Sequence, residues 1–213
     1  MKNILFDLDG TLTDPKVGIT KSVAYALKHY GIEVDNLDTL CKFIGPPLIQ
    51  SFCGYYGFSE KQAAEAVDVY REYFSVTGLF ENEVYDGVEE MLKTLKADGK
   101  RLFIATSKPE VFARRILEHF SLDGYFECIR GIELGEEHVP KEVIIDRLIK
   151  GYDLDVTETI MVGDRSFDIE GAAANSLPCV AVLYGYGNRE EFEKSGAYKI
   201  VETVKELQAY LRS

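Results

Sequence analysis

Two aspartates stand two residues apart where a short apolar run near the start of the chain ends. Residues 4–6 have the length of a buried parallel strand, Asp7 and Asp9 follow, and Gly10 marks a sharp turn. Strand side chains alternate with period two, so both carboxylates are predicted to point the same way. Carboxylates placed like this repel each other unless a cation or a shared proton relieves them. The pattern fits either a catalytic or metal-binding pair or a plain polar strand end followed by a turn.

A second acidic pair follows another apolar run, residues 159–162. Asp164 comes directly after that run, and Asp168 lies one helical turn later. Mg²⁺ prefers a few carboxylate oxygens, water and substrate phosphate, so two more acids near Asp7 would suit it. Asp168 is also expected to act as the N-cap of a helix over residues 168–175.

A hydroxyl-bearing pair, Thr106 and Ser107, follows the apolar run 102–105, with Pro109 shortly after it. A hydroxyl at a strand tip beside a helix amino terminus can bind a phosphate oxygen. The same residues can equally be a simple helix cap, because Ser or Thr before a Pro is a common helix start.

These residues need a scaffold, and the chain alternates short apolar strands with helical patterns from residue 84 onward. Such alternation predicts an α/β fold with a doubly wound parallel sheet. The expected strands are 101–105, 125–129, 159–162 and 179–183, and the expected helices are 88–98, 109–119, 141–152, 168–175 and 204–211.

Residues 16–83 differ from the rest, because they show helical periodicity and no convincing strand. Helices are expected from about residue 17 to 30, over 47–56, and from Ser59, whose Ser-Glu-Lys-Gln sequence fits a capping box. The chain is therefore predicted to form an α/β core domain, residues 1–15 and 84–213, with an inserted all-helical domain, residues 16–83.

The string Asp-Leu-Asp-Gly-Thr-Leu-Thr-Asp at residues 7–14 resembles the first motif of the haloacid dehalogenase superfamily. Thr106 matches the second motif, and residues 163–168 with the run 171–175 resemble the fourth. Lys141 is the best candidate for the third, although Pro140-Lys141 replaces the more usual Lys-Pro. A solvated Lys141 is the alternative, with Lys150 and Lys108 as other cations. The resemblance implies a Rossmann-like core with a helical cap of the C1 type, and a Mg²⁺-dependent phosphatase.

The resemblance also implies roles for individual residues. Asp7 would be the nucleophile that forms an aspartyl-phosphate, and Asp9 the general acid and base. Thr106 and Lys141 would bind the transferred phosphoryl group. The remaining expectations are Mg²⁺ ligation by Asp7, Asp9 (through its backbone carbonyl), Asp164 and Asp168, and substrate contacts from Gly10, Thr11, Ser107 and Gly45.

The phosphoglycolate phosphatase-like branch is the most similar in the cap loop, residues 43–48, and near residues 85–88, where Asp86 replaces its usual Pro. The expected substrate is a small phosphorylated metabolite such as phosphoglycolate. A 5′-nucleotidase or broad sugar phosphatase stays open, as do a β-phosphoglucomutase-type phosphomutase and a non-catalytic binding module. Gly45 and its prolines can also be only a rigid turn.

The Tyr-Gly-Tyr-Gly run at residues 184–187 follows the last expected strand. The sequence leaves open whether this run cradles part of the substrate or is a flexible linker with packing tyrosines.

Composition limits the partners. The formal net charge is -12, which argues against nucleic acid and an anionic membrane surface. The four cysteines include no Cys-x-x-Cys pair, so reduced thiols in a cytoplasmic protein are expected. A cleaved signal peptide would remove Asp7, and no apolar run is long enough to span a membrane. Monomer and homodimer both remain possible.

Overall fold

A computed structural model describes residues 1–136 and 139–213. The chain divides into two compact units, Met1–Asp14 with Val84–Ser213 and Pro15–Glu83. Among the described residues, none of the helices combines the length and the apolar character that crossing a bilayer requires.

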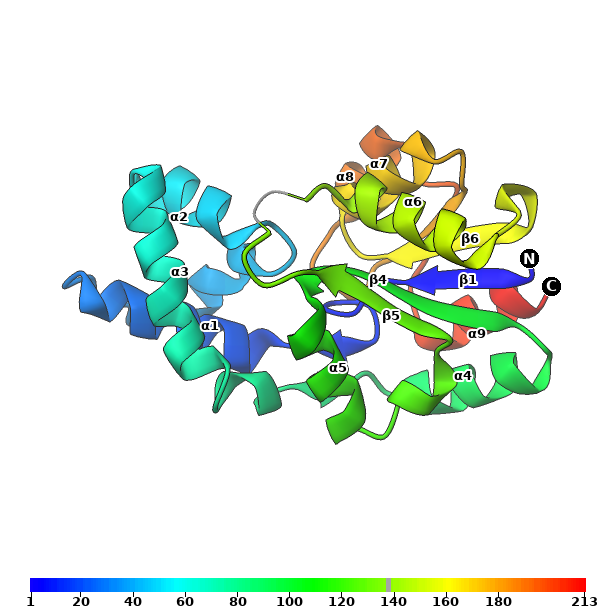
Figure 1. Cartoon of the computed structure of the whole chain (residues 1–213), viewed down its shortest axis with the longest axis horizontal. Helices are drawn as coiled ribbons and strands as arrows, with labels where there is room; N and C mark the ends of the chain where they lie inside the picture. The colour runs from blue at the N-terminus through cyan, green and yellow to red at the C-terminus, as the bar shows by residue number, and fades with distance from the viewer. Residues whose placement is uncertain (137–138) are drawn as a thin grey trace. The chain divides into compact units, whose positions relative to one another are not determined.

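The first unit is built on a six-stranded sheet with the order β5-β4-β1-β6-β7-β8 (Figure 1). All of its strand pairs are parallel, and Leu5 lies between Phe103 and Met161 in the register. The chain winds outward from β1 first to one edge and then to the other. In such sheets, ligands bind beyond the carboxyl ends of the strands where the winding reverses. The strands are β1 (Asn3–Phe6), β4 (Arg101–Pro109), β5 (Cys128–Ile132), β6 (Thr159–Gly163), β7 (Cys179–Val182) and β8 (Lys199–Val201).

Helices cover both faces of this sheet. In Figure 1, α6, α7 and α8 lie on one face and α4, α5 and α9 on the other. The first face packs Leu5, Phe103 and Met161 against apolar side chains of α6, α7 and α8 in one buried cluster. Both faces are apolar, as parallel strands require. The helices are α4 (Val88–Ala97), α5 (Glu110–His119), α6 (Lys141–Tyr152), α7 (Ser166–Ala174), α8 (Arg189–Ser195) and α9 (Val204–Arg212), with the short 3₁₀ helices η3 (Asp123–Tyr125) and η4 (Val156–Glu158) between them.

The second unit is helical. A T-shaped contact between Phe43 and Phe52 lies in its core, and Ser59 forms a capping box with Gln62 at the start of α3. Close packing of α1 on η2 is possible because Gly18 and Gly78 have no side chains. The helices are α1 (Lys16–His29), η1 (Leu37–Phe43), α2 (Leu48–Tyr56), α3 (Glu60–Phe74) and η2 (Gly78–Phe80). The short strands β2 (Thr13–Asp14) and β3 (Glu83–Val84) form a separate two-stranded sheet.

The α/β class and the doubly wound sheet predicted from the sequence are confirmed, and so is the helix over residues 141–152. Three expectations need correction. Strand β5 lies three residues later than predicted; α8 was missed because its sequence is mostly polar, and β8 because it has only 3 residues. Helix α7 begins at Ser166, so Asp168 lies inside its first turn and is not the N-cap; Arg165 is.

Candidate active site

Three carboxylates from two neighbouring strand ends meet at the edge of the sheet. Asp7 follows β1, Asp164 follows β6, and Asp168 lies in the first turn of α7. Each offers an oxygen within 4.8 Å of the others, and all three residues are buried. The parallel pairing of β1 with β6 brings them together, and the Asp7 N–H extends that pairing by donating to the Val162 carbonyl at 2.9 Å.

Glycines, which have no side chain, leave space for these carboxylates. Gly10 has a φ of +79°, which favours glycine, and a β-carbon there would overlap the Asp164 carboxylate. A β-carbon on Gly163 would overlap the Asp168 carboxylate in the same way. Both glycines that flank the acidic motifs in the sequence therefore have a steric reason to be there.

Lys141 is the cation at the centre of this group. Its Nζ lies 3.0 Å from Asp7 Oδ1 and 2.8 Å from Asp168 Oδ1, and donates to the Ala105 carbonyl at 2.9 Å. Its stem passes Gly171, where a β-carbon would come within 2.9 Å of it. Burial by itself lowers the pKa of Lys141, but the carboxylates of Asp168 and Asp7 outweigh burial and raise it above its ordinary value. The ammonium group therefore stays charged.

Asp9 has a cation of its own. Its Oδ2 lies 2.7 Å from Lys108 Nζ, and both side chains are largely buried. Burial raises the pKa of Asp9 above its ordinary value, and Lys108 opposes that shift. The Asp9 carboxylate is not one of the three clustered acids. Asp9 can therefore serve a different purpose from Asp7, although only two residues separate them.

The charges of this site do not balance. Asp7, Asp9, Asp164 and Asp168 face Lys141 and Lys108, which leaves two negative charges in excess when all six groups are ionised. Burial first, and then the neighbouring Asp168 and Asp7, raise the pKa of Asp164 well above its ordinary value. Its buried Oδ1 has no hydrogen-bond partner among the described residues. A small divalent cation fits this all-oxygen donor set and its excess charge.

The other predicted site residues lie in different settings. Thr106 is buried, and its Oγ1 accepts a hydrogen bond from the Lys108 N–H at 3.2 Å. Thr11 is also buried, and Ser107, the residue that follows Thr106, is partly exposed. Gly45 belongs to the helical unit, with a φ of +101°.

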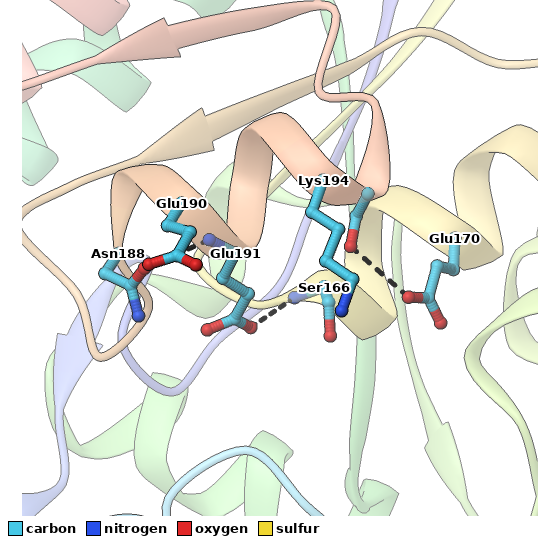
Figure 2. Close-up of a pocket in the computed structure, with 7 residues that line it drawn as sticks. Ser166, Glu170, Asn188, Glu190, Glu191 and Lys194 are labelled. Atoms are coloured by element: carbon cyan, nitrogen blue, oxygen red, sulfur yellow. Dashed lines mark hydrogen bonds between the residues drawn. The ribbon is translucent and has the colours of Figure 1, made fainter.

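Helix α8, which the sequence did not reveal, supports the acidic loop from outside. Glu191 accepts hydrogen bonds from the Ser166 N–H at 2.7 Å and from Arg165 Nε at 3.1 Å. Figure 2 shows Glu191 reaching from α8 to Ser166 at the start of α7. In turn, Asp168 Oδ2 accepts from the backbone N–H groups of Asp164 and Arg165. These contacts fix the loop that carries Asp164.

The pocket drawn in Figure 2 lies between α7 and α8 and has a volume of about 640 Å³. None of the three clustered acids lines it. The residues that do are Ser166, Glu170, Asn188, Glu190, Glu191, Lys194 and Ser195.

Two groups of site residues were not assigned from the sequence. Lys108 was named only as an alternative cation, although a Lys two residues after Thr106 was a usable signal. The contacts from residues 184–187 to Asp164 could not be predicted from the sequence, because they join residues about twenty positions apart.

Comparison with known proteins adds independent information. Residues 4–182 match the family model described as haloacid dehalogenase-like hydrolase. A 5′-nucleotidase of Pseudomonas aeruginosa is 50% identical over 189 residues, 89% of this chain and 86% of that protein. The tyrosine-protein kinase PtkA of Mycobacterium tuberculosis is 36% identical, and the match covers 98% of this chain and 72% of that protein. A phosphoglycolate phosphatase of Colwellia psychrerythraea is 29% identical over 96% of this chain and 94% of that protein.

Among solved structures, the crystal structure of a "predicted phosphatase from Clostridium acetobutylicum" superimposes with a TM-score of 0.96. It is 48% identical and the match covers 99% of this chain and 97% of that one. The similarity therefore extends over both units of the chain.

The first prediction concerns the buried cation. Replacing Lys141 by Met leaves Asp7 and Asp168 buried without their partner, and should lower the free energy of unfolding by about 3–5 kcal/mol. The matched control is Lys150→Met, which removes an exposed ion pair with Asp146 on the same helix and should cost less than about 1 kcal/mol. Urea denaturation in EDTA measures both. Equal losses in the two variants would contradict the central place given to Lys141.

Proposed function

Because this chain belongs to the haloacid dehalogenase-like hydrolases and is a phosphatase, we propose that it hydrolyses small phosphate monoesters through a phosphorylated Asp7 with the help of Mg²⁺. The observation that carries the proposal is the buried group formed by Asp7, Asp164, Asp168 and Lys141 at the carboxyl edge of the sheet.

Asp7 is the proposed nucleophile. A carboxylate can attack phosphorus, displace the leaving alkoxide and hold the phosphoryl group as an acyl phosphate. Lys141 Nζ, 3.0 Å from Asp7 Oδ1, forms an ion pair with this carboxylate and fixes its direction. The ion pair is made by Oδ1, and the other oxygen, Oδ2, is the one proposed to attack phosphorus.

Asp9 is the proposed acid and base. It lies two residues beyond Asp7, close enough to serve the same phosphoryl group, and its partner is Lys108 rather than Lys141. In the first step a protonated Asp9 gives its proton to the leaving oxygen. In the second, the carboxylate takes a proton from the water that attacks the acyl phosphate. Asp7 and Asp9 are therefore proposed to have different roles, because Asp7 pairs with Lys141 and Asp9 with Lys108.

The phosphoryl oxygens need positive charge and hydrogen-bond donors. We assign this role to Lys141 and to the Thr106 hydroxyl, whose oxygen already accepts from the Lys108 N–H and whose own O–H is left to donate. Gly10, Thr11 and Ser107 are proposed to add contacts from the two strand ends. Mg²⁺ would be held by Asp7, Asp164, the Asp9 backbone carbonyl and Asp168, directly or through water, and when bound supplies positive charge that lets an anion approach an anion.

The helical unit, residues 15–83, is proposed to be the cap of this enzyme. Caps close over active sites, exclude water and present residues that recognise the substrate. Gly45 and the prolines that follow it are the proposed recognition loop, because the positive φ of Gly45 gives a turn that other residues adopt at a cost.

The substrate is proposed to be a nucleoside 5′-monophosphate. The relative named 5′-nucleotidase is 50% identical, whereas the relative named phosphoglycolate phosphatase is 29% identical. This difference reverses the order of preference that the sequence motifs alone had favoured. Phosphoglycolate becomes the second candidate, and water remains the proposed acceptor.

The nucleophile assignment predicts that Asp7→Asn lowers kcat for p-nitrophenyl phosphate by at least about 10³-fold, because an amide does not form the acyl phosphate. The fold should persist, since the side chain keeps its shape. Asp123→Asn, an exposed aspartate of the same unit, is the control and should retain full activity. Substantial turnover by the Asp7 variant, with circular dichroism unchanged, would remove Asp7 from this role.

The metal assignment predicts that Mg²⁺ stabilises the protein against heat, because it binds the folded site and relieves its excess negative charge. At a concentration 100 times its Kd, a ligand adds about 2.7 kcal/mol, which is several degrees in Tm. EDTA should reverse the shift and abolish hydrolysis. In Asp164→Asn the shift should disappear. A wild-type Tm that does not change when Mg²⁺ is added would contradict the proposed site.

The substrate assignment predicts a higher kcat/KM for nucleoside 5′-monophosphates than for phosphoglycolate or hexose phosphates. Phosphate release is measured for each compound under identical conditions, with no bisphosphate activator added. Higher kcat/KM for phosphoglycolate would restore the second candidate. Isomerisation of a hexose phosphate without phosphate release would favour the phosphomutase alternative.

A further inference from the structure

Residues 184–187, which we name the tyrosine–glycine loop, follow β7 and make three hydrogen bonds, one to a clustered acid and two to the segment that follows Asp7. The Tyr186 N–H donates to Asp164 Oδ2 at 2.8 Å, and the Tyr184 hydroxyl donates to the Thr11 carbonyl at 3.1 Å. The Tyr186 hydroxyl donates to Asp14 Oδ1. Each bond goes to a different point: a clustered acid, the turn after Asp7, and the residue at which the first segment of this unit ends.

The glycines of the loop allow this contact. A β-carbon on Gly185 would overlap the Gly10 carbonyl oxygen and come within 2.6 Å of Asp164 Oδ2, and one on Gly187 would overlap the Asp164 carbonyl oxygen. The Asp164 side chain therefore lies between two backbone segments, the turn at Gly10 and the loop at Gly185. Its buried surroundings leave it little freedom to change rotamer.

Tyr85 supports the loop from the side. Its ring makes a T-shaped contact with Tyr184 at 5.1 Å between centroids. Burial raises the pKa of Tyr184 above its ordinary value, and does the same for Tyr85. These phenols therefore remain neutral hydrogen-bonding groups rather than adding negative charge beside the acids. The contacts exclude a flexible linker, which was one of the two alternatives left open by the sequence.

We infer that the tyrosine–glycine loop holds Asp164 in the orientation that binds the metal ion, and that Tyr186 is a positioning residue which ties Asp164 to Asp14. The inference rests on the proposed metal site. Groups that hold a metal ligand from behind set its direction, and their loss typically costs 10–100-fold in metal affinity. Tyr186 contributes through two groups: its backbone N–H donates to Asp164, and its hydroxyl anchors the loop to Asp14.

The experiment measures Mn²⁺ binding by electron paramagnetic resonance, which counts free Mn²⁺ and needs no turnover. Mn²⁺ suits the same oxygen ligands as Mg²⁺. Gly185→Ala should raise the Kd by about 10-fold or more, and Tyr186→Phe by a smaller factor of about 3–10, since it keeps the N–H contact. The matched controls are Gly151→Ala, where a β-carbon meets nothing within 4 Å, and Tyr198→Phe, an exposed tyrosine; both should bind as wild type.

Asp14 gives a test of the link itself. Asp14→Asn keeps an acceptor for the Tyr186 hydroxyl and should stay within about 2-fold of the wild-type Kd, whereas Asp14→Ala removes the acceptor and should weaken binding. If the two residues act through one hydrogen bond, Tyr186→Phe should add nothing in the Asp14→Ala background. Additive effects in that double variant would overturn the link.

The outcomes separate this inference from the proposed function. Wild-type binding that Asp164→Asn abolishes supports the metal site; if folded Tyr186→Phe and Gly185→Ala then bind Mn²⁺ as tightly as wild type, the positioning role is wrong. Should Gly185→Ala fail to fold, Tyr186→Phe alone decides. Binding that is absent, or unchanged in Asp164→Asn, overturns the metal site and the positioning role together.

Discussion

Electrostatic repulsion among buried carboxylates is the constraint around which this site is organised. Asp7, Asp164 and Asp168 converge within one small volume, and Lys141 is the ammonium group placed between two of them. Such a cluster is costly to bury unless positive charge compensates it. The lysine compensates part of the negative charge, and we propose that a metal ion compensates the rest. This incomplete compensation is what makes the site suited to bind a cation together with a phosphate.

The fold meets this constraint with three structural means. Parallel strands β1 and β6 end side by side, which brings acids from distant parts of the sequence together. Glycines at positions 10, 163 and 171 remove the side chains that would occupy the space of Asp164, Asp168 and Lys141. Backbone N–H groups then fix two of the carboxylates, since Asp168 accepts from the Arg165 N–H and Asp164 from the Tyr186 N–H. Asp164 and Asp168 are thus held by backbone groups that do not themselves take part in the proposed chemistry.

Much of this arrangement could be predicted from local sequence. Apolar runs of strand length identified β1, β6 and β7, and acids directly after the first two predicted where carboxylates would meet. The polar sequence of α8 gave no helical pattern of apolar residues, and β8 is too short to show a period. The first turn of α7 was missed because Arg165 is an unusual N-cap. The pairing of Asp9 with Lys108 rather than Lys141 depends on side-chain packing, which periodicity does not encode. The role of the tyrosine–glycine loop could not be predicted either, because it depends on contacts with residues 10, 11, 14 and 164, which are distant in the sequence.

We propose that Asp7 itself carries the phosphoryl group during turnover. The most direct measurement is to quench the reaction in acid, reduce any acyl phosphate with borohydride, and sequence the peptides by mass spectrometry. Reduction of an aspartyl-phosphate gives homoserine, so the account predicts homoserine at position 7 and unmodified aspartate at position 9. Homoserine at another position, or none while substrate is being turned over, would contradict the account.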